Sequence, residues 1–109
     1  LGQLTETFVF QELRRQASWH KDSLSFFHFR DKDGVEVDMV IERGPRAVAA
    51  VEVKASATVR AADFSGMRKL KAAAGRYFAG GVVLYDGEIA ASFGDGLYAV
   101  PIRSLWEAA

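Results

Sequence analysis

Four charged residues lie in two stretches of the chain that are otherwise typical of β-strands. Glu36 and Asp38 interrupt GVEVDMVIE, and Glu52 and Lys54 interrupt AVAAVEVKA. Side chains alternate along a strand, so Glu36, Asp38 and Val40 are expected on one face. Glu52 and Lys54 are expected together on one face of the next strand. Carboxylates gathered in this way are suitable ligands for a divalent cation such as Mg²⁺.

The turn at Pro45 gives the predicted register of these two strands. A hairpin folded there places Asp38 opposite Glu52 and Glu36 opposite Lys54. Facing carboxylates repel each other, and either protonation of one carboxyl or a bound cation would offset the repulsion. The competing interpretation of Glu36 and Lys54 is a solvated ion pair worth less than ~1 kcal/mol. For Asp38 and Glu52 it is the exposed face of an antiparallel sheet.

Another acid, Glu6, lies in a helix predicted for residues 2–17. Val9, Phe10 and Leu13 follow it at helical spacing, so Glu6 belongs to the stripe expected to pack on the sheet. A carboxylate there needs a partner or a cation. The alternative is an acid near the helix N-terminus, where the helix dipole favours negative charge.

Hydrophobic periodicity and turn residues predict the remaining elements. Short turns join the first three strands, which favours an antiparallel meander, and a helix before the fourth strand allows a parallel crossover. The sequence therefore predicts an α/β domain with a mixed sheet, helices on its faces and a C-terminal strand pair. The expected strands are residues 24–30, 35–42, 47–55, 82–85, 88–93 and 97–102, and the second helix is 63–74.

Composition narrows the class of protein. The 109 residues fit one globular domain, and 14 basic against 14 acidic residues argue against a broadly basic nucleic-acid wrapper. The absence of cysteine excludes disulfides and thiolate metal sites, and it favours a cytoplasmic location. No membrane span or signal peptide is predicted. Because the chain begins at Leu1 within a helical pattern, we expect a fragment of a longer chain.

A cluster of basic residues lies in and around the second helix. These side chains could bind DNA phosphates, or they could form the solvated face of an amphipathic helix. The two histidines, His20 and His28, lack the spacing of metal ligands, so no metal is expected to bind through histidine. The basic residues are Arg60, Arg68, Lys69, Lys71 and Arg76.

Asp38, followed on the next strand by Glu52-Val53-Lys54 and preceded by Glu6 on a helix, resembles the PD-(D/E)xK nuclease superfamily. The element order is similar to the αβββαβ core of its restriction endonuclease-like fold. The order of the acidic residues is similar to that in archaeal Holliday-junction resolvases. The residue before Asp38 is not proline, which departs from the motif's usual form.

A longer resemblance covers nearly the whole chain. Six stretches are similar to the C-terminal region of a family of prokaryotic AAA-type ATPases, catalogued as a domain of unknown function. This resemblance implies an N-terminal ATPase region of the same polypeptide, which would hold the ATP site. The stretches are GQLTETFVFQEL, FRDKDGVEVDMVIE, AVEVKAS, DFSGMRKL, GGVVLYDGE and VPIRSLW.

The nuclease resemblance implies a role for each site residue. Asp38 and Glu52 would ligate Mg²⁺ or Mn²⁺, with the backbone carbonyl of Val53 as a third ligand. The metal would polarise a phosphodiester and help generate hydroxide from water. Lys54 would orient the attacking water and stabilise developing charge, and Glu6 would complete the acidic pocket.

Two functions are compatible with these residues. One is a metal-dependent DNA endonuclease-like domain that hydrolyses phosphodiester bonds beside an ATPase. The alternative is a catalytically inactive domain of the same fold that binds DNA or a protein partner for the ATPase. Self-association through strand edges, giving a homo-oligomer, is a further expectation.

Overall fold

The computed structural model describes residues 11–12, 24–30, 32, 34, 36–44 and 47–107 of the chain. Gln11 and Glu12, within the predicted first helix, are helical. The elements that follow are β1 (Leu24–Arg30), β2 (Glu36–Arg43), β3 (Ala47–Lys54), the 3₁₀ turn η1 (Ala61–Phe64), α2 (Ser65–Ala74), the 3₁₀ turn η2 (Gly75–Tyr77), β4 (Phe78–Tyr85), β5 (Ala91–Ser92), β6 (Leu97–Pro101) and α3 (Ser104–Glu107).

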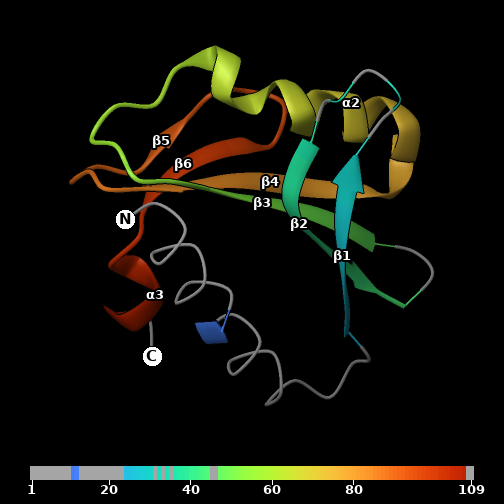
Figure 1. Ribbon diagram of the computed structural model, residues 1–109, viewed down its shortest axis with the longest axis horizontal. Helices are drawn as coiled ribbons and strands as arrows, with labels where there is room; N and C mark the ends of the chain where they lie inside the picture. The colour runs from blue at the N-terminus through green and yellow to red at the C-terminus, as the bar shows by residue number, and fades with distance from the viewer. Residues whose placement is uncertain are drawn as a thin grey trace.

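All of these strands belong to one six-stranded sheet of order β1-β2-β3-β4-β6-β5 (Figure 1). The first three strands form an antiparallel meander. β4 lies parallel to both β3 and β6, and β5 lies antiparallel to β6. The predicted α/β class, mixed sheet and C-terminal strand pair are therefore confirmed.

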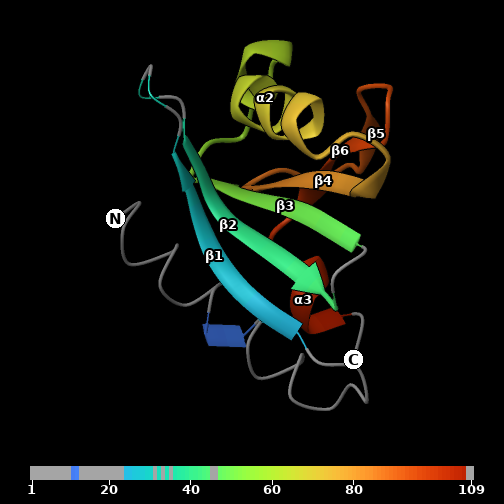
Figure 2. The ribbon, with the colours of Figure 1, turned by 90° about the vertical axis from the view of Figure 1, so that its right-hand side faces the viewer.

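Helix α2 covers one face of the sheet, and the short helix α3 lies on the opposite side (Figure 2). Phe64, Met67 and Leu70 carry the apolar stripe of η1 and α2, and all three are buried against the sheet. Their partners on the strands are Val37, Val40, Ala50, Val83, Tyr85, Leu97 and Ala99. Burial of this stripe fixes α2 above the centre of the sheet.

The opposite face of the sheet carries a second core cluster. Its buried members are Met39, Val51 and Leu84, and Leu105 of α3 packs against them. Adjacent residues of β3 and β4 therefore face different cores: Ala50 and Val51 belong to different clusters. A strand buried on both faces is expected to be nearly all apolar, which is the composition of β3 and β4. Within the described ranges, no helix is long and apolar enough to cross a membrane.

Two glycines allow α2 to lie close to the strands. A Cβ atom on Gly66 would overlap the backbone carbonyl oxygen of Glu36, and one on Gly81 would lie 2.6 Å from Met67 Sδ. β4 begins at Phe78 and includes Gly81, so the strand is longer than the one predicted for residues 82–85. β5 is shorter than predicted, with only Ala91 and Ser92 in the strand.

Candidate functional site

The β2–β3 ladder ends beside the two carboxylates that the sequence singles out. The pairs from Arg43↔Ala47 to Met39↔Val51 have the register predicted for a hairpin at Pro45. The next residues along the two strands are Asp38 and Glu52. Beyond the pair Met39↔Val51, β2 and β3 are no longer paired through their backbones. Backbone N–H groups there donate to side-chain carboxylates instead.

Asp38 and Glu52 each accept a hydrogen bond from the backbone of the other strand. The N–H of Asp38 donates to Glu52 Oε1 at 3.1 Å, and the N–H of Val53 donates to Asp38 Oδ2 at 3.0 Å. Both carboxylates are half-buried. Hydrogen bonds from backbone N–H groups to an ionised acceptor are among the stronger ones, so they offset part of the repulsion between the two charges. The predicted proximity of these two residues is thus found at the end of the ladder.

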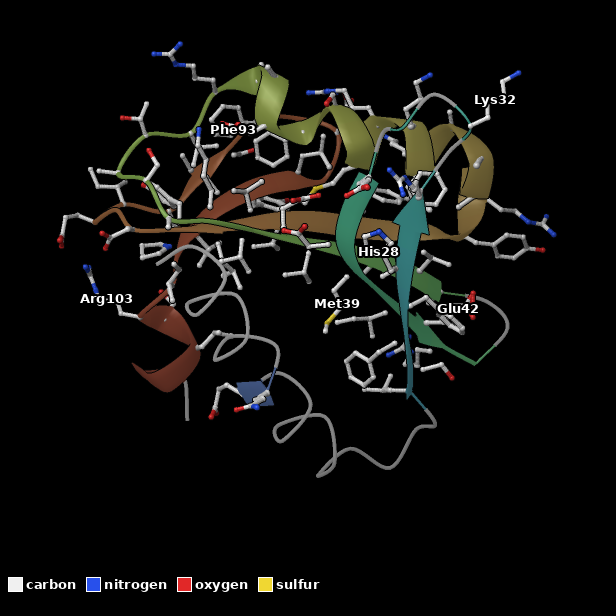
Figure 3. All side chains as sticks on the ribbon, in the orientation of Figure 1. His28, Lys32, Met39, Glu42, Phe93 and Arg103 are labelled. Atoms are coloured by element: carbon white, nitrogen blue, oxygen red, sulfur yellow. The ribbon has the colours of Figure 1, made fainter. Side chains whose placement is uncertain are left out.

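A β-bulge in β2 sets the direction of Asp38. Phe27 pairs with Val40 but Phe29 pairs with Val37, so two residues of β2 lie opposite one residue of β1. The extra residue breaks the alternation of side chains. Val37 packs with the α2-side core, while Met39 packs on the other side of the sheet (Figure 3).

This bulge corrects one prediction from the sequence. Val37 and Val40 both lie on the α2 side, so Glu36, next to Val37, does not share a face with Val40. The Asp38 side chain points toward β3, because its carboxylate accepts a hydrogen bond from the backbone N–H of Val53. Strict alternation fails here because the bulge inserts one residue relative to β1.

The predicted ion pair between Glu36 and Lys54 is also wrong. Glu36 lies 3.2 Å from Arg30 Nε and 4.0 Å from His28 Nε2, both on the neighbouring strand β1. Lys54 Nζ instead lies 2.7 Å from Asp63 Oδ2, in the turn η1. The ladder between β2 and β3 ends before these two residues, so nothing aligns them as cross-strand partners.

Asp63 is a residue that the sequence reasoning missed. Its Oδ2 accepts hydrogen bonds from Lys54 Nζ and from the backbone N–H of Arg60, both at 2.7 Å. Burial raises the pKa of Asp63, but the bonds from Lys54 and Arg60 and their positive charges together lower the pKa below its usual value. The sequence does contain a signal for this role. Asp63 lies three residues after Arg60 at the start of a helical segment, where an acidic side chain often accepts a hydrogen bond from the backbone N–H of the capping residue.

The donor set fits a hard divalent cation. Mg²⁺ is commonly held by one or two carboxylates and keeps several waters, and Asp38 and Glu52 supply two adjacent carboxylates. The N–H and C=O of a strand residue point to the same strand edge, so the Val53 carbonyl lies on the edge that faces Asp38. Over the described ranges no three histidine or acidic side chains cluster as metal ligands. A metal here would therefore rely on the carbonyl and water, and Glu6 lies outside the described residues.

The basic residues in and around α2 have different surroundings. Arg60 is exposed and lies three residues before Asp63. Arg68 Nη1 lies 3.4 Å from Asp95 Oδ2, and Lys71 Nζ donates to the Asp95 carbonyl at 3.1 Å. These contacts tie α2 to the turn before β6, so Arg68 has a structural partner. Lys69 is exposed on the same helix.

A cavity of 410 Å³ lies elsewhere on the α2 side, over β1, β2 and β3. Apolar side chains line most of it, among them Phe27, Leu70 and Tyr77, with Glu42 at its wall. Neither Asp38, Glu52 nor Lys54 contributes to this cavity. The acidic pair therefore lies at the open end of the β2–β3 ladder, outside this cavity.

Comparison with known proteins places the chain in a family. No curated protein matches it. The family described as "Domain of unknown function (DUF4143)" matches residues 1–105, which is nearly the whole chain. The match includes the acidic pair, Lys54 and the whole described sheet. The chain therefore belongs to the DUF4143 family of domains of unknown function.

Proposed function

We propose that this domain is a metal-dependent nuclease-like domain that hydrolyses DNA phosphodiester bonds. One observation carries the proposal: reciprocal hydrogen bonds bring the carboxylates of Asp38 and Glu52 together where β2 and β3 separate. Lys54 follows two residues after Glu52, so it lies on the same face of β3. Two carboxylates and a lysine on the same face of the strand are suited to charge stabilisation during phosphodiester hydrolysis.

Each residue has a defined task in this proposal. Asp38 and Glu52 would hold Mg²⁺ or Mn²⁺ with the carbonyl of Val53. The bound ion supplies Lewis acidity at the phosphate and lowers the pKa of a ligand water. Lys54 donates hydrogen bonds that orient the attacking water and stabilise negative charge on the phosphate. The half-buried position of both carboxylates strengthens their interaction with a cation compared with fully solvated side chains.

The wider setting is part of the same proposal. The six sequence stretches similar to the C-terminal region of prokaryotic AAA-type ATPases support an ATPase region on the same polypeptide. The βββαβ order of the described elements and the mixed sheet support a restriction endonuclease-like core. DNA would then be the substrate, and the cytoplasm would be the compartment.

The first test is a calorimetric Mn²⁺ titration of the chain, with and without a short DNA duplex. The wild type is expected to bind Mn²⁺ saturably, and Asp38→Asn and Glu52→Gln are expected to lose this binding. Glu88→Gln is a matched control, because the Glu88 side chain is 83% exposed and forms an ion pair with Arg103. Absence of binding in the wild type, or equal loss in the control, would contradict a metal site at Asp38 and Glu52.

Cleavage is tested separately from metal binding. A supercoiled plasmid and a labelled duplex are incubated with Mg²⁺ or Mn²⁺ and the chain. Lys54→Met is expected to retain Mn²⁺ binding but to lose cleavage, because Lys54 acts on water and phosphate and not as a ligand. Metal binding without cleavage by the wild type on any DNA form would argue against the nuclease function.

A second, non-catalytic function is favoured because the charged groups of the site are already bound to other groups of the protein. Lys54 is engaged by Asp63, and Asp38 and Glu52 accept backbone hydrogen bonds, so the pairing could serve structure alone. The domain would then be a non-catalytic partner that binds DNA or a protein for the ATPase. DNA binding in EDTA that Asp38→Asn and Glu52→Gln leave unchanged, measured by electrophoretic mobility, is the expected result for this alternative.

A further inference from the structure

We propose that Asp63 is the positioning residue that holds the Lys54 ammonium group at the acidic site. The inference rests on the proposed nuclease function and assigns a residue to it outside the acidic pair and the lysine. The shared hydrogen bond between Lys54 Nζ and Asp63 Oδ2 is 2.7 Å long. Both side chains are largely shielded from solvent, with 32% of Lys54 and 27% of Asp63 exposed.

Asp63 is a firm anchor because its own position is fixed twice. Its Oδ2 accepts the backbone N–H of Arg60, which closes the turn η1 on itself. The next residue, Phe64, is fully buried, and the centroid of its ring lies 4.8 Å from that of Phe93. Phe93 lies on the α2 side of the sheet (Figure 3). Because the Asp63 carboxylate is fixed by these contacts, it restrains the position of the Lys54 ammonium group that binds it.

The connection between β3 and η1 is also tied to the sheet. The backbone N–H of Asp86, after β4, donates to the carbonyl of Ser56 at 2.9 Å. This bond fixes the start of the β3–η1 connection beside the end of β4. The ion pair then places Asp63, seven residues after Ser56, beside Lys54.

A fixed lysine is what the proposed chemistry requires. Lysine has a flexible four-carbon side chain, and a freely rotating ammonium group spends little time at one position. The ammonium group has three N–H donors, and the bond to Asp63 uses one of them. The others can serve water and a phosphate oxygen. Correct placement of a catalytic group matters strongly, since a shift of about 1 Å can reduce a rate about 100-fold.

The test compares Asp63→Asn and Asp63→Glu with the wild type, and Asp86→Asn is the control at an exposed acid near the same strand end. The first measurement is acetylation of each lysine by acetic anhydride, quantified by peptide mass spectrometry. Lys54 acetylation relative to exposed Lys32 is expected to rise at least about 3-fold in Asp63→Asn, because the ammonium loses its ionic partner. Asp63→Glu is expected to stay near the wild type, and Asp86→Asn is expected to be unchanged.

The second measurement is single-turnover DNA cleavage with Mn²⁺, together with the Mn²⁺ affinity. Asp63→Asn is expected to lower the cleavage rate about 10- to 100-fold without changing the Mn²⁺ affinity. Asp63→Glu is expected to restore part of the rate, which a purely structural role of Asp63 would not predict. Circular dichroism of each variant establishes that the fold is retained.

The outcomes separate this inference from the proposed function. Unchanged Lys54 acetylation in Asp63→Asn overturns the positioning role, whether or not the chain cleaves DNA. Raised acetylation with unchanged cleavage also overturns it, if Lys54→Met abolishes cleavage. A wild-type chain that never cleaves DNA overturns the proposed function and the catalytic use of the pair, while acetylation still decides whether Asp63 holds Lys54.

Discussion

At the scale of single residues, the candidate site combines groups that repel each other with groups that satisfy them. Asp38 and Glu52 are adjacent carboxylates, and each accepts an N–H from the opposite strand. Lys54 is bound to a third acid, Asp63. Residues kept in such a costly arrangement are commonly those that function requires, and their replacement often increases stability.

The first prediction concerns stability in the absence of metal. Glu52→Gln removes one of the two facing charges while its amide oxygen can still accept the N–H of Asp38. We expect the free energy of unfolding to rise by up to about 1 kcal/mol, the size of one cross-strand pair effect. Urea unfolding in EDTA measures this. A loss of more than about 1 kcal/mol would mean that Glu52 is a structural residue.

The second prediction concerns the pH dependence of the Asp63 contribution. Because the pKa of Asp63 is lowered by folding, its charge stabilises the fold above the unfolded-state pKa, and this stabilisation is lost as pH falls through the lowered pKa. Asp63→Asn is therefore expected to lower the free energy of unfolding by about 1 kcal/mol near pH 7.

The difference between Asp63→Asn and the wild type is expected to disappear progressively below about pH 4, the ordinary pKa of aspartate. Urea unfolding between pH 2.5 and 7 measures it. Asp86→Asn supplies the comparison, since Asp86 lies at an exposed position. A difference that stays constant down to the lowest pH would show that the charge of Asp63 contributes nothing.

At the scale of elements, the sequence predicts the β2–β3 register but misses the bulge. The register follows from a short hairpin at Pro45 and from alternation in β3, which are both local signals. The bulge depends on how β1 pairs with β2, and a pairing shift of one residue leaves no mark in the composition of β2. This explains why Asp38 and Glu52 are found together, whereas Glu36 faces β1.

The partner of Lys54 is missed for a similar reason. Lys54 and Asp63 are nine residues apart, and the path of the intervening loop decides whether they meet. No periodicity applies to an irregular loop, so spacing alone favours a partner on the neighbouring strand. Most basic residues in and around α2 are exposed, which both interpretations of them allow, but the contact between Arg68 and Asp95 depends on a distant turn.

The third prediction concerns the contact between α2 and β2. Gly66→Ala is expected to destabilise the domain by about 1–3 kcal/mol, because its Cβ would overlap the Glu36 carbonyl and push α2 away. Helix propensity alone predicts the opposite sign, a gain of up to about 1 kcal/mol. Chemical denaturation measures the difference, and exposed Ala72→Gly calibrates propensity on the same helix. A more stable Gly66→Ala would contradict the close approach.

At the scale of the whole molecule, the α/β class follows from the sequence because the order of elements is local information. The sheet order is less local: β6 lies between β4 and β5, so the C-terminal strand pair extends the sheet through β6. The site lies where the antiparallel meander β1–β3 meets the parallel part β3–β4–β6. Metal binding there would join the ends of β2 and β3.

The last prediction follows from that position, because a ligand that binds only the folded state raises its stability. At Mn²⁺ tenfold above its dissociation constant, the gain is about 1.4 kcal/mol. For a domain of about 100 residues, this raises the melting temperature by roughly 6–11 °C. Differential scanning fluorimetry with Mn²⁺ and with EDTA measures the shift. Asp38→Asn and Glu52→Gln are expected to abolish it, and Glu88→Gln is expected to retain it. An equal shift in all four proteins would mean that Mn²⁺ binds elsewhere, and the acidic pair would then owe its proximity to folding alone.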